Sequence, residues 1–179
     1  MTAEKRIVML GDSLTAGHDW SRVFPGARVR NLGINGDTVA GVWGRLDDAL
    51  TPTPDKIFVQ IGINDFLRGA TPDEIGDIHL RIWDEIRERS PQTALRVVSM
   101  LPFLEASFPG LPPTLELVWL NRRLADEAAQ RGLVFIDLFE ALADENRQLR
   151  LDYTSDGLHL LPEAYAVWAE FLQAAERNS

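Results

Sequence analysis

The chain has 179 residues, of which 45% are hydrophobic, and its formal net charge is −9 at pH 7. This length and apolar content are typical of a single folded domain, so we expect one domain over residues 1–179. The acidic balance disfavours nucleic acid and anionic membrane surfaces as partners, because both select basic patches. The sequence has no cysteine, which excludes disulfides, thiolate metal sites and a cysteine nucleophile.

The three histidines, His18, His79 and His159, are scattered, and no pair has the spacing of a metal-binding helix. We therefore expect neither a metal nor a cofactor. The amino-terminal apolar run at residues 7–10 is shorter than the hydrophobic region of a signal peptide, and no stretch approaches the ~20 apolar residues of a membrane span. The simplest interpretation is a cytoplasmic protein without stable membrane insertion, although a leader removed beforehand would leave no trace.

Short apolar runs alternate with segments of helical periodicity along the chain. Runs rich in β-branched residues predict five buried strands, at residues 6–10, 28–33, 56–62, 95–100 and 133–138. Apolar residues at three- and four-residue steps predict three helices, at residues 72–90, 114–131 and 162–176. Thr71, Pro72 and Glu74 form a capping-box start for the first helix, and Gly132 is a typical end for the second. We expect His79, in the first helix, to face solvent.

This alternation predicts an α/β fold with three layers, α/β/α, around a flavodoxin-like, parallel five-stranded sheet. In such folds the functional site lies beyond the carboxyl ends of the strands. One irregular stretch, residues 101–113, is apolar and rich in proline, and loops of that length are uncommon unless they are functional. Packing on the core, a dimer contact and substrate binding all remain open for it. For substrate binding the candidates are Phe103, Leu104 and Phe108.

The sequence GDSLTAG at residues 11–17 follows the first predicted strand. Taken alone, Ser13 is best explained as a helix N-cap, and Asp12 as a turn residue. The phosphate-binding patterns GxxxxGK[ST] and GxGxxG are absent, as is the nucleophile elbow GxSxG. A catalytic serine also needs a base, a group that orients the base, and an oxyanion hole. Asp156 and His159, in DGLHL, are close enough in sequence to supply the first two. Taken alone, this segment is best explained as a turn aspartate and a surface histidine.

Two further segments follow strands at the same expected edge of the sheet. In NLGINGDT (31–38), Gly36 has no side chain to keep its backbone N–H away from a substrate, and Gly33 competes for the same role. In GINDF (62–66), the side-chain amide of Asn64 is a neutral donor suited to an oxyanion. Each has an ordinary alternative, a loop glycine before an N-capping Asp37 and an Asx-turn asparagine. Their convergence on one edge favours the catalytic interpretation.

These four segments resemble, in order, the sequence blocks of the SGNH/GDSL hydrolases, and the resemblance covers nearly the whole chain. The resemblance implies that Ser13 is the nucleophile and that Asp156 and His159 complete a catalytic triad. It further implies an oxyanion hole formed by the N–H groups of Ser13 and Gly36 and by the side chain of Asn64. GINGDT (33–38) corresponds to the second block of the family, and that match assigns the role of backbone oxyanion donor to Gly36 rather than Gly33.

The same resemblance implies a flavodoxin-like fold and metal-free esterase, thioesterase or lipase activity. We expect a serine esterase for small carboxylic esters with short acyl groups, including O-acetyl esters, because the chain offers little to enclose a long acyl tail. Hydrolysis of acyl thioesters or lysophospholipids is the first alternative, and a catalytically inactive binding module is the second. The expected partner is a small-molecule acyl ester. The leaving group and the formation of a homo-oligomer stay open, as does a contact of His18 with the site.

Overall fold

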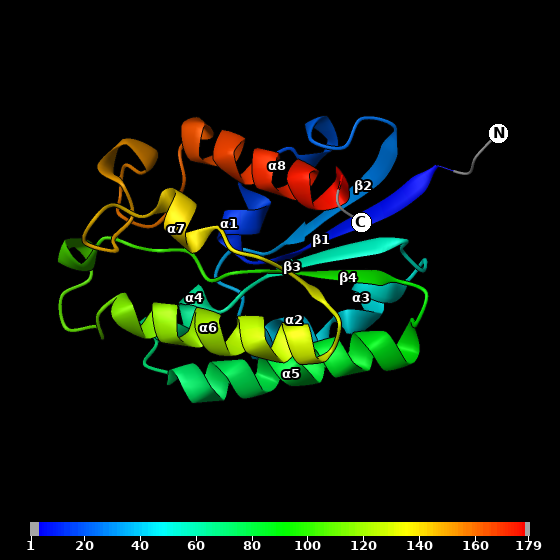
Figure 1. The fold of residues 1–179 in the computed structure, drawn as a ribbon, viewed down its shortest axis with the longest axis horizontal. Coiled ribbons are helices and arrows are strands. Elements are labelled where there is room, and N and C mark those ends of the chain that lie inside the picture. The colour runs from blue at the N-terminus through cyan, green and yellow to red at the C-terminus, as the bar shows by residue number, and fades with distance from the viewer. Residues whose placement is uncertain (1–3, 178–179) are drawn as a thin grey trace.

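A computed structural model describes residues 4–177, and its centre is a five-stranded, all-parallel sheet of order β2-β1-β3-β4-β5 (Figure 1). All five predicted strands are present, with ends that differ by one to a few residues from the prediction. Their bounds are β1 Lys5–Gly11, β2 Ala27–Gly33, β3 Lys56–Gln60, β4 Ala94–Val98 and β5 Val134–Ile136.

The long helices also follow the prediction, as α5 Pro72–Arg89, α6 Leu115–Gln130 and α8 Pro162–Arg177. The capping box of α5 is present, since the Thr71 side chain accepts from the Glu74 N–H and the Glu74 side chain accepts from the Thr71 N–H. Gly132, with φ +66°, takes up the left-handed backbone just after α6. The shorter segments are α1 Ser13–Ala16, α2 Val39–Gly44, α3 Leu46–Leu50, α4 Ile63–Leu67, α7 Phe139–Leu142, and the 3₁₀ turns η1 Trp20–Arg22, η2 Glu105–Ser107 and η3 Leu151–Tyr153.

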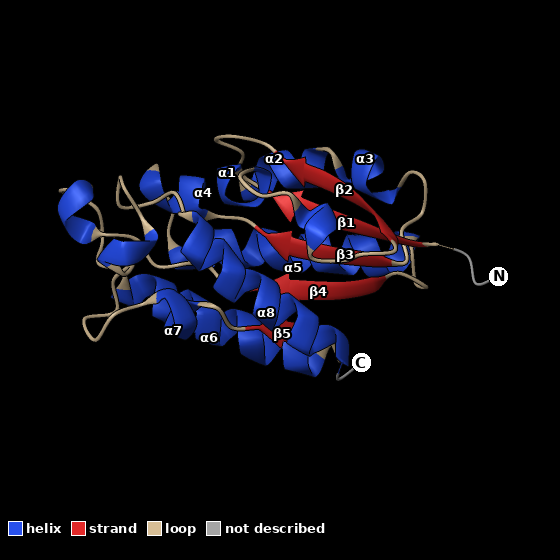
Figure 2. Cartoon of the chain, turned by 90° about the horizontal axis from the view of Figure 1, so that it is seen from above, coloured by secondary structure: helices blue, strands red, loops and turns tan. Residues whose placement is uncertain are grey.

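The helices form two layers that cover the sheet. Figure 1 shows α8 on one face and α5 with α6 on the other, and Figure 2 shows the strands running side by side between them. The architecture is therefore the predicted three-layer α/β/α fold. Every residue of the central strand β3 is buried, because both of its faces are covered, which explains its continuous apolar run. Among residues 4–177, no helix combines the length and apolar content that would let it cross a membrane.

The prediction that His79 faces solvent is wrong. His79 is only 1% exposed, and its Nε2 lies 3.0 Å from the carbonyl oxygen of Ile61. Burial lowers the pKa of His79 to about 4, so the ring is neutral at pH 7. The physical reason is its place on the helix: His79 lies four residues after Ile75 and three before Ile82, on the stripe that α5 packs against the sheet.

The order of the strands decides where a site can form. From β1 the chain crosses to β2 on one side, whereas β3, β4 and β5 lie on the other side of β1. The crossovers therefore diverge at the carboxyl ends of β1 and β3, and this switch point leaves a crevice in doubly wound sheets. Ser13 follows β1 by two residues and Asn64 follows β3 by four.

Candidate active site

Ser13 is held at the carboxyl end of β1 by the short helix α1. Asp12 is the N-cap of this helix, and its Oδ1 accepts a hydrogen bond of 2.9 Å from the N–H of Leu14. Capping is therefore the role of Asp12, and the N-cap explanation of Ser13 is wrong. Ser13 is the first residue of α1 and is half-buried. A backbone N–H at that position has no acceptor within its own helix, so it is free to serve a ligand.

The structure brings His159 and Asp156 to Ser13 from the other end of the chain. The Nε2 of His159 lies 3.1 Å from Ser13 Oγ, and the Nδ1 of the same ring lies 2.6 Å from Asp156 Oδ2. The imidazole therefore bridges the hydroxyl and the carboxylate. This is the arrangement in which a histidine removes a proton from serine while a carboxylate fixes its tautomer.

The segment from Thr154 to His159 forms a turn around the Asp156 carboxylate. Asp156 Oδ1 accepts hydrogen bonds from the N–H groups of Leu158 (2.9 Å) and His159 (2.8 Å), and Thr154 Oγ1 donates to the carbonyl of His159. Partial burial raises the pKa of Asp156, but the His159 ring and the two N–H groups outweigh it and lower the pKa to about 2. The group is therefore a carboxylate throughout the neutral range.

Tyr165, on helix α8, ties helix α1, which begins with Ser13, to the helix that follows His159 in the chain. Its hydroxyl donates a hydrogen bond of 2.8 Å to the carbonyl of Leu14, in the helix that begins with Ser13. A side chain at Gly17 would collide with the same hydroxyl, so α1 and α8 approach closely only because residue 17 is glycine. The sequence shows Tyr165 as one apolar position of a helix and gives no signal of this contact.

The predicted oxyanion donors lie in a turn after β2 and on the helix after β3. The N–H of Asp37 donates to the carbonyl of Ile34, and Gly36 between them has φ +76°, the backbone of a type II turn. Asn64 is half-buried on α4, and its Nδ2 donates to the carbonyl of Asp37 at 2.9 Å, which leaves its second N–H free for another acceptor.

The backbone N–H groups of Gly33 and Gly36, the two candidate oxyanion donors, differ in their hydrogen bonds. The N–H of Gly33 donates to Asn31 Oδ1 at 2.9 Å, inside strand β2. Gly36 is solvent-exposed, and no acceptor for its N–H is found within residues 4–177. The geometry therefore favours Gly36. The ordinary alternative for this segment is a loop glycine followed by Asp37 as a helix N-cap. Asp37 does not have that role, because the N-cap of α2 is Thr38.

The loop at residues 101–113 packs against the turn at residues 154–159, which holds Asp156 and His159. Leu104 donates its N–H to the carbonyl of Gly157 at 2.8 Å, and a side chain at Gly157 would collide with Ser107. The sequence predicts Phe103 as a substrate contact, but the structure buries Phe103 completely, with its ring packed near those of Phe66 and Phe108. Of the three predicted substrate contacts, Leu104 and Phe108 are half-buried and keep part of their surface accessible.

His18 lies close to the nucleophile in sequence, yet its ring belongs to an aromatic cluster behind α1. The ring stacks on Tyr165 with centroids 4.8 Å apart and meets the edge of Trp20. Burial lowers the pKa of His18, which keeps it neutral at pH 7. Within residues 4–177, no three His, Asp or Glu side chains are grouped so that they could hold a metal ion.

Asp12 is an unusual capping residue because its carboxyl group is fully buried. Only Oδ1 has a partner among residues 4–177, while Oδ2 is buried without one. Burial raises the pKa of Asp12 to about 7, and the nearby carboxylates of Asp37 and Asp65 add to the effect against the opposing hydrogen bond from Leu14. The carboxyl group thus changes its charge close to neutral pH, in the residue next to Ser13.

We expect this carboxyl group to make the wild-type protein less stable as the pH rises. Between its unfolded pKa near 4 and its folded pKa near 7, only the folded state keeps the proton, so the free energy of unfolding falls over that window. Asp12→Asn keeps a capping oxygen without the charge. Urea unfolding should show the stability of the variant relative to wild type rising by roughly 2–3 kcal/mol from pH 5 to pH 8.

Asp126→Asn, on the exposed face of α6, is the control and should keep the pH dependence of wild type. Parallel curves for wild type and Asp12→Asn would show that Asp12 is ionised in the folded state across the whole range.

This chain resembles known proteins in sequence and in fold. The model of the GDSL-like lipase/acylhydrolase family matches residues 9–167. The chain belongs to this family. Its members hydrolyse ester bonds, so this GDSL-family protein is an ester hydrolase, as the sequence predicts.

Among its relatives, an arylesterase of Vibrio mimicus is 25% identical over an alignment of 197 positions, and the alignment covers 95% of this chain and 87% of that protein. An N-acylneuraminate cytidylyltransferase of Streptococcus agalactiae is 25% identical over 157 residues, which cover 88% of this chain and 35% of that longer protein.

Two solved structures share the fold of this GDSL-family protein. A GDSL-like lipase from Bacteroides thetaiotaomicron superposes with a TM-score of 0.83 at 22% identity, covering 97% of this chain and 88% of its own. A lipase/acylhydrolase from Enterococcus faecalis gives 0.77 at 22% identity, with 96% and 94% covered.

Proposed function

We propose that this GDSL-family protein is a serine esterase that cleaves small carboxylic esters with short acyl groups, including O-acetyl esters, and that residues 1–179 act as one catalytic domain. The observation that carries the proposal is the hydrogen-bonded relay from Ser13 Oγ to His159 Nε2 and from His159 Nδ1 to Asp156, with contacts of 3.1 and 2.6 Å. It lies at the switch point of the sheet, where ligands bind in doubly wound folds.

In the proposed mechanism, Ser13 Oγ attacks the ester carbonyl carbon while His159 Nε2 takes the hydroxyl proton. Asp156 fixes the ring and stabilises the imidazolium that forms. The N–H groups of Ser13, Gly36 and Asn64 donate to the tetrahedral oxyanion. The alkoxide then leaves with the proton from His159, and a water molecule activated by the same ring cleaves the acyl-enzyme.

The size of the acyl group follows from what surrounds the nucleophile. A methylene contributes about 0.8 kcal/mol to binding only where a groove excludes water around it. Leu104, whose N–H donates to the carbonyl of Gly157, and Phe108 are half-buried side chains of the loop at residues 101–113, so part of each side chain stays open to solvent.

We expect kcat/KM on p-nitrophenyl esters to be highest between acetate and butyrate and to fall by octanoate. The measurement is initial rates over the series from acetate to palmitate. Values that climb beyond octanoate would refute the short-acyl preference and favour the alternative, a thioesterase or lysophospholipase with Phe108 in its acyl site. In that case Phe108→Ala should flatten the climb, while Phe171→Ala, an exposed ring on α8, should leave it unchanged.

A further inference from the structure

Three side chains within five residues, on α4 or directly after it, bind the turn at residues 34–37 and the first residue of α2. Asn64 donates to the carbonyl of Asp37, Asp65 Oδ2 accepts from the N–H of Val39 at 3.0 Å, and Arg68 Nη2 donates to the carbonyl of Gly36 at 3.0 Å. Gly36 and Asn64, two of the three proposed donors, therefore lie on separate segments that these side chains connect.

Arg68 is suited to fix the position of Gly36. Its backbone N–H donates to the carbonyls of Asn64 and Asp65, so it closes the same helical turn that carries Asn64. Its guanidinium group reaches the exposed turn, where Nη2 lies 3.8 Å from the place a side chain would take at Gly36. Within residues 4–177, this hydrogen bond to Gly36 is the one that its side chain makes.

The turn needs such an anchor because its own hydrogen bond, from the N–H of Asp37 to the carbonyl of Ile34, lies within the turn and does not fix the turn relative to α4. Arg68 binds the carbonyl of Gly36, in the same residue as the N–H that the proposal places in the oxyanion hole, so its bond limits how far that N–H can move relative to Asn64. Two donors stabilise one oxyanion only if they converge on it, and a misplacement of about 1 Å can cost as much as 10²-fold in rate.

We propose that Arg68 is a positioning residue that holds the backbone N–H of Gly36 and the side chain of Asn64 in one oxyanion hole. This inference rests on the proposed function, in which both groups bind the tetrahedral intermediate. Arg68 itself does not touch the reacting atoms. Its effect is on the transition state, so its loss should lower kcat and leave KM unchanged.

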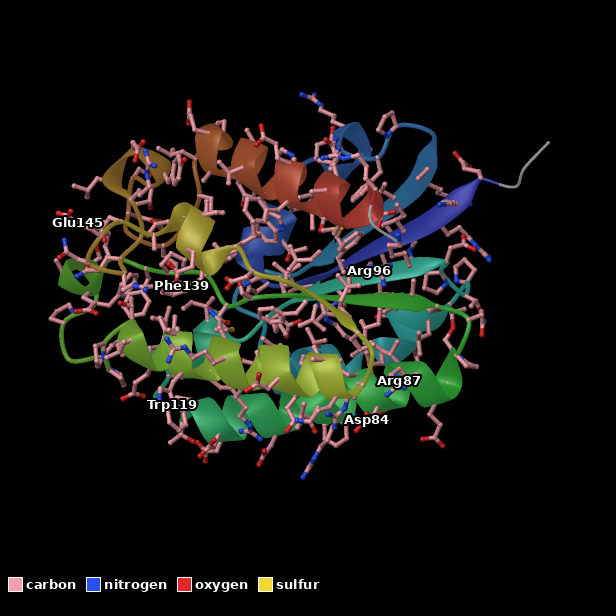
Figure 3. All side chains as sticks on the ribbon, viewed as in Figure 1. Asp84, Arg87, Arg96, Trp119, Phe139 and Glu145 are labelled. Carbon is pink, nitrogen blue, oxygen red and sulfur yellow. The ribbon has the colours of Figure 1, made fainter. Side chains whose placement is uncertain are left out.

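The test compares Arg68→Ala with a matched control, Arg87→Ala. Figure 3 shows Arg87 near the end of α5 that lies toward the amino ends of the strands, far from the turn. With p-nitrophenyl acetate, Arg68→Ala should lower kcat about tenfold and keep KM within about twofold, whereas Arg87→Ala should match wild type. Guanidinium at low millimolar concentration should restore part of the kcat of Arg68→Ala and leave Arg87→Ala unaffected.

Three measurements separate the outcomes. A kcat of Arg68→Ala within about twofold of wild type, or a raised KM with unchanged kcat, would overturn the inference. Thermal unfolding checks that the variant is folded at the assay temperature; if it is not, Arg68→Lys takes its place, with an expected loss of about threefold and a wild-type kcat as the contrary result. A wild-type protein without esterase activity would instead refute the proposed function.

Discussion

The Ser13→Ala variant is expected to lose roughly 10⁴–10⁶-fold in kcat on p-nitrophenyl acetate and all labelling by a fluorophosphonate. The reason is that, among residues 4–177, Ser13 Oγ is the hydroxyl that contacts His159 Nε2 and can form the acyl-enzyme. The fold should persist, because Asp12 rather than Ser13 caps helix α1. Mass spectrometry of the labelled protein identifies the modified residue, and initial rates give kcat.

Ser21→Ala, at an exposed serine in η1, is the matched control and should keep both labelling and turnover. Labelling that persists in Ser13→Ala would end the serine-hydrolase interpretation. Wild-type protein that takes up no probe and cleaves no ester would leave the inactive binding module as the explanation of the fold.

The second large effect is expected for Asp156→Asn, which should remain folded and lose about 10⁴-fold in kcat. An asparagine oxygen can still accept from the N–H groups of Leu158 and His159, so the turn is kept. Its amide nitrogen, however, donates a hydrogen bond to His159 Nδ1, whereas the carboxylate accepts one from the Nδ1–H. The ring proton then sits on Nε2, facing Ser13, and the ring can no longer act as base.

Kinetics at neutral pH and a far-ultraviolet circular dichroism spectrum check this prediction. The control is Asp152→Asn, an exposed carboxylate that pairs with Arg150, and it should turn over like wild type. An Asp156→Asn protein with more than about a tenth of wild-type turnover would mean that another group orients the ring.

Patterns carried by neighbouring residues determined much of this structure in advance. Strands β1 and β3 are covered on both faces, so their sequences are continuous apolar runs that can be recognised without a fold. The capping box at Thr71 and the glycine at 132 are local as well, since the groups that interact lie within one turn of helix. The short helices α1, α2, α3, α4 and α7 escaped prediction because four to six residues are too few to show a helical period.

The motifs GDSLTAG, GINGDT and GIND likewise determined which residue types follow strands β1, β2 and β3, and DGLH which ones precede helix α8, but the motifs did not determine how these residues meet. The 3.1 Å contact between Ser13 and His159 spans 146 positions of sequence, and the bond from Tyr165 to Leu14 that supports it spans 151. Burial is just as non-local: His79 and Phe103 are buried because other segments cover them. Only the tertiary structure decided these contacts, together with the hydrogen bond from Arg68 to Gly36, because each depends on how separately folded segments pack at the edge of the sheet.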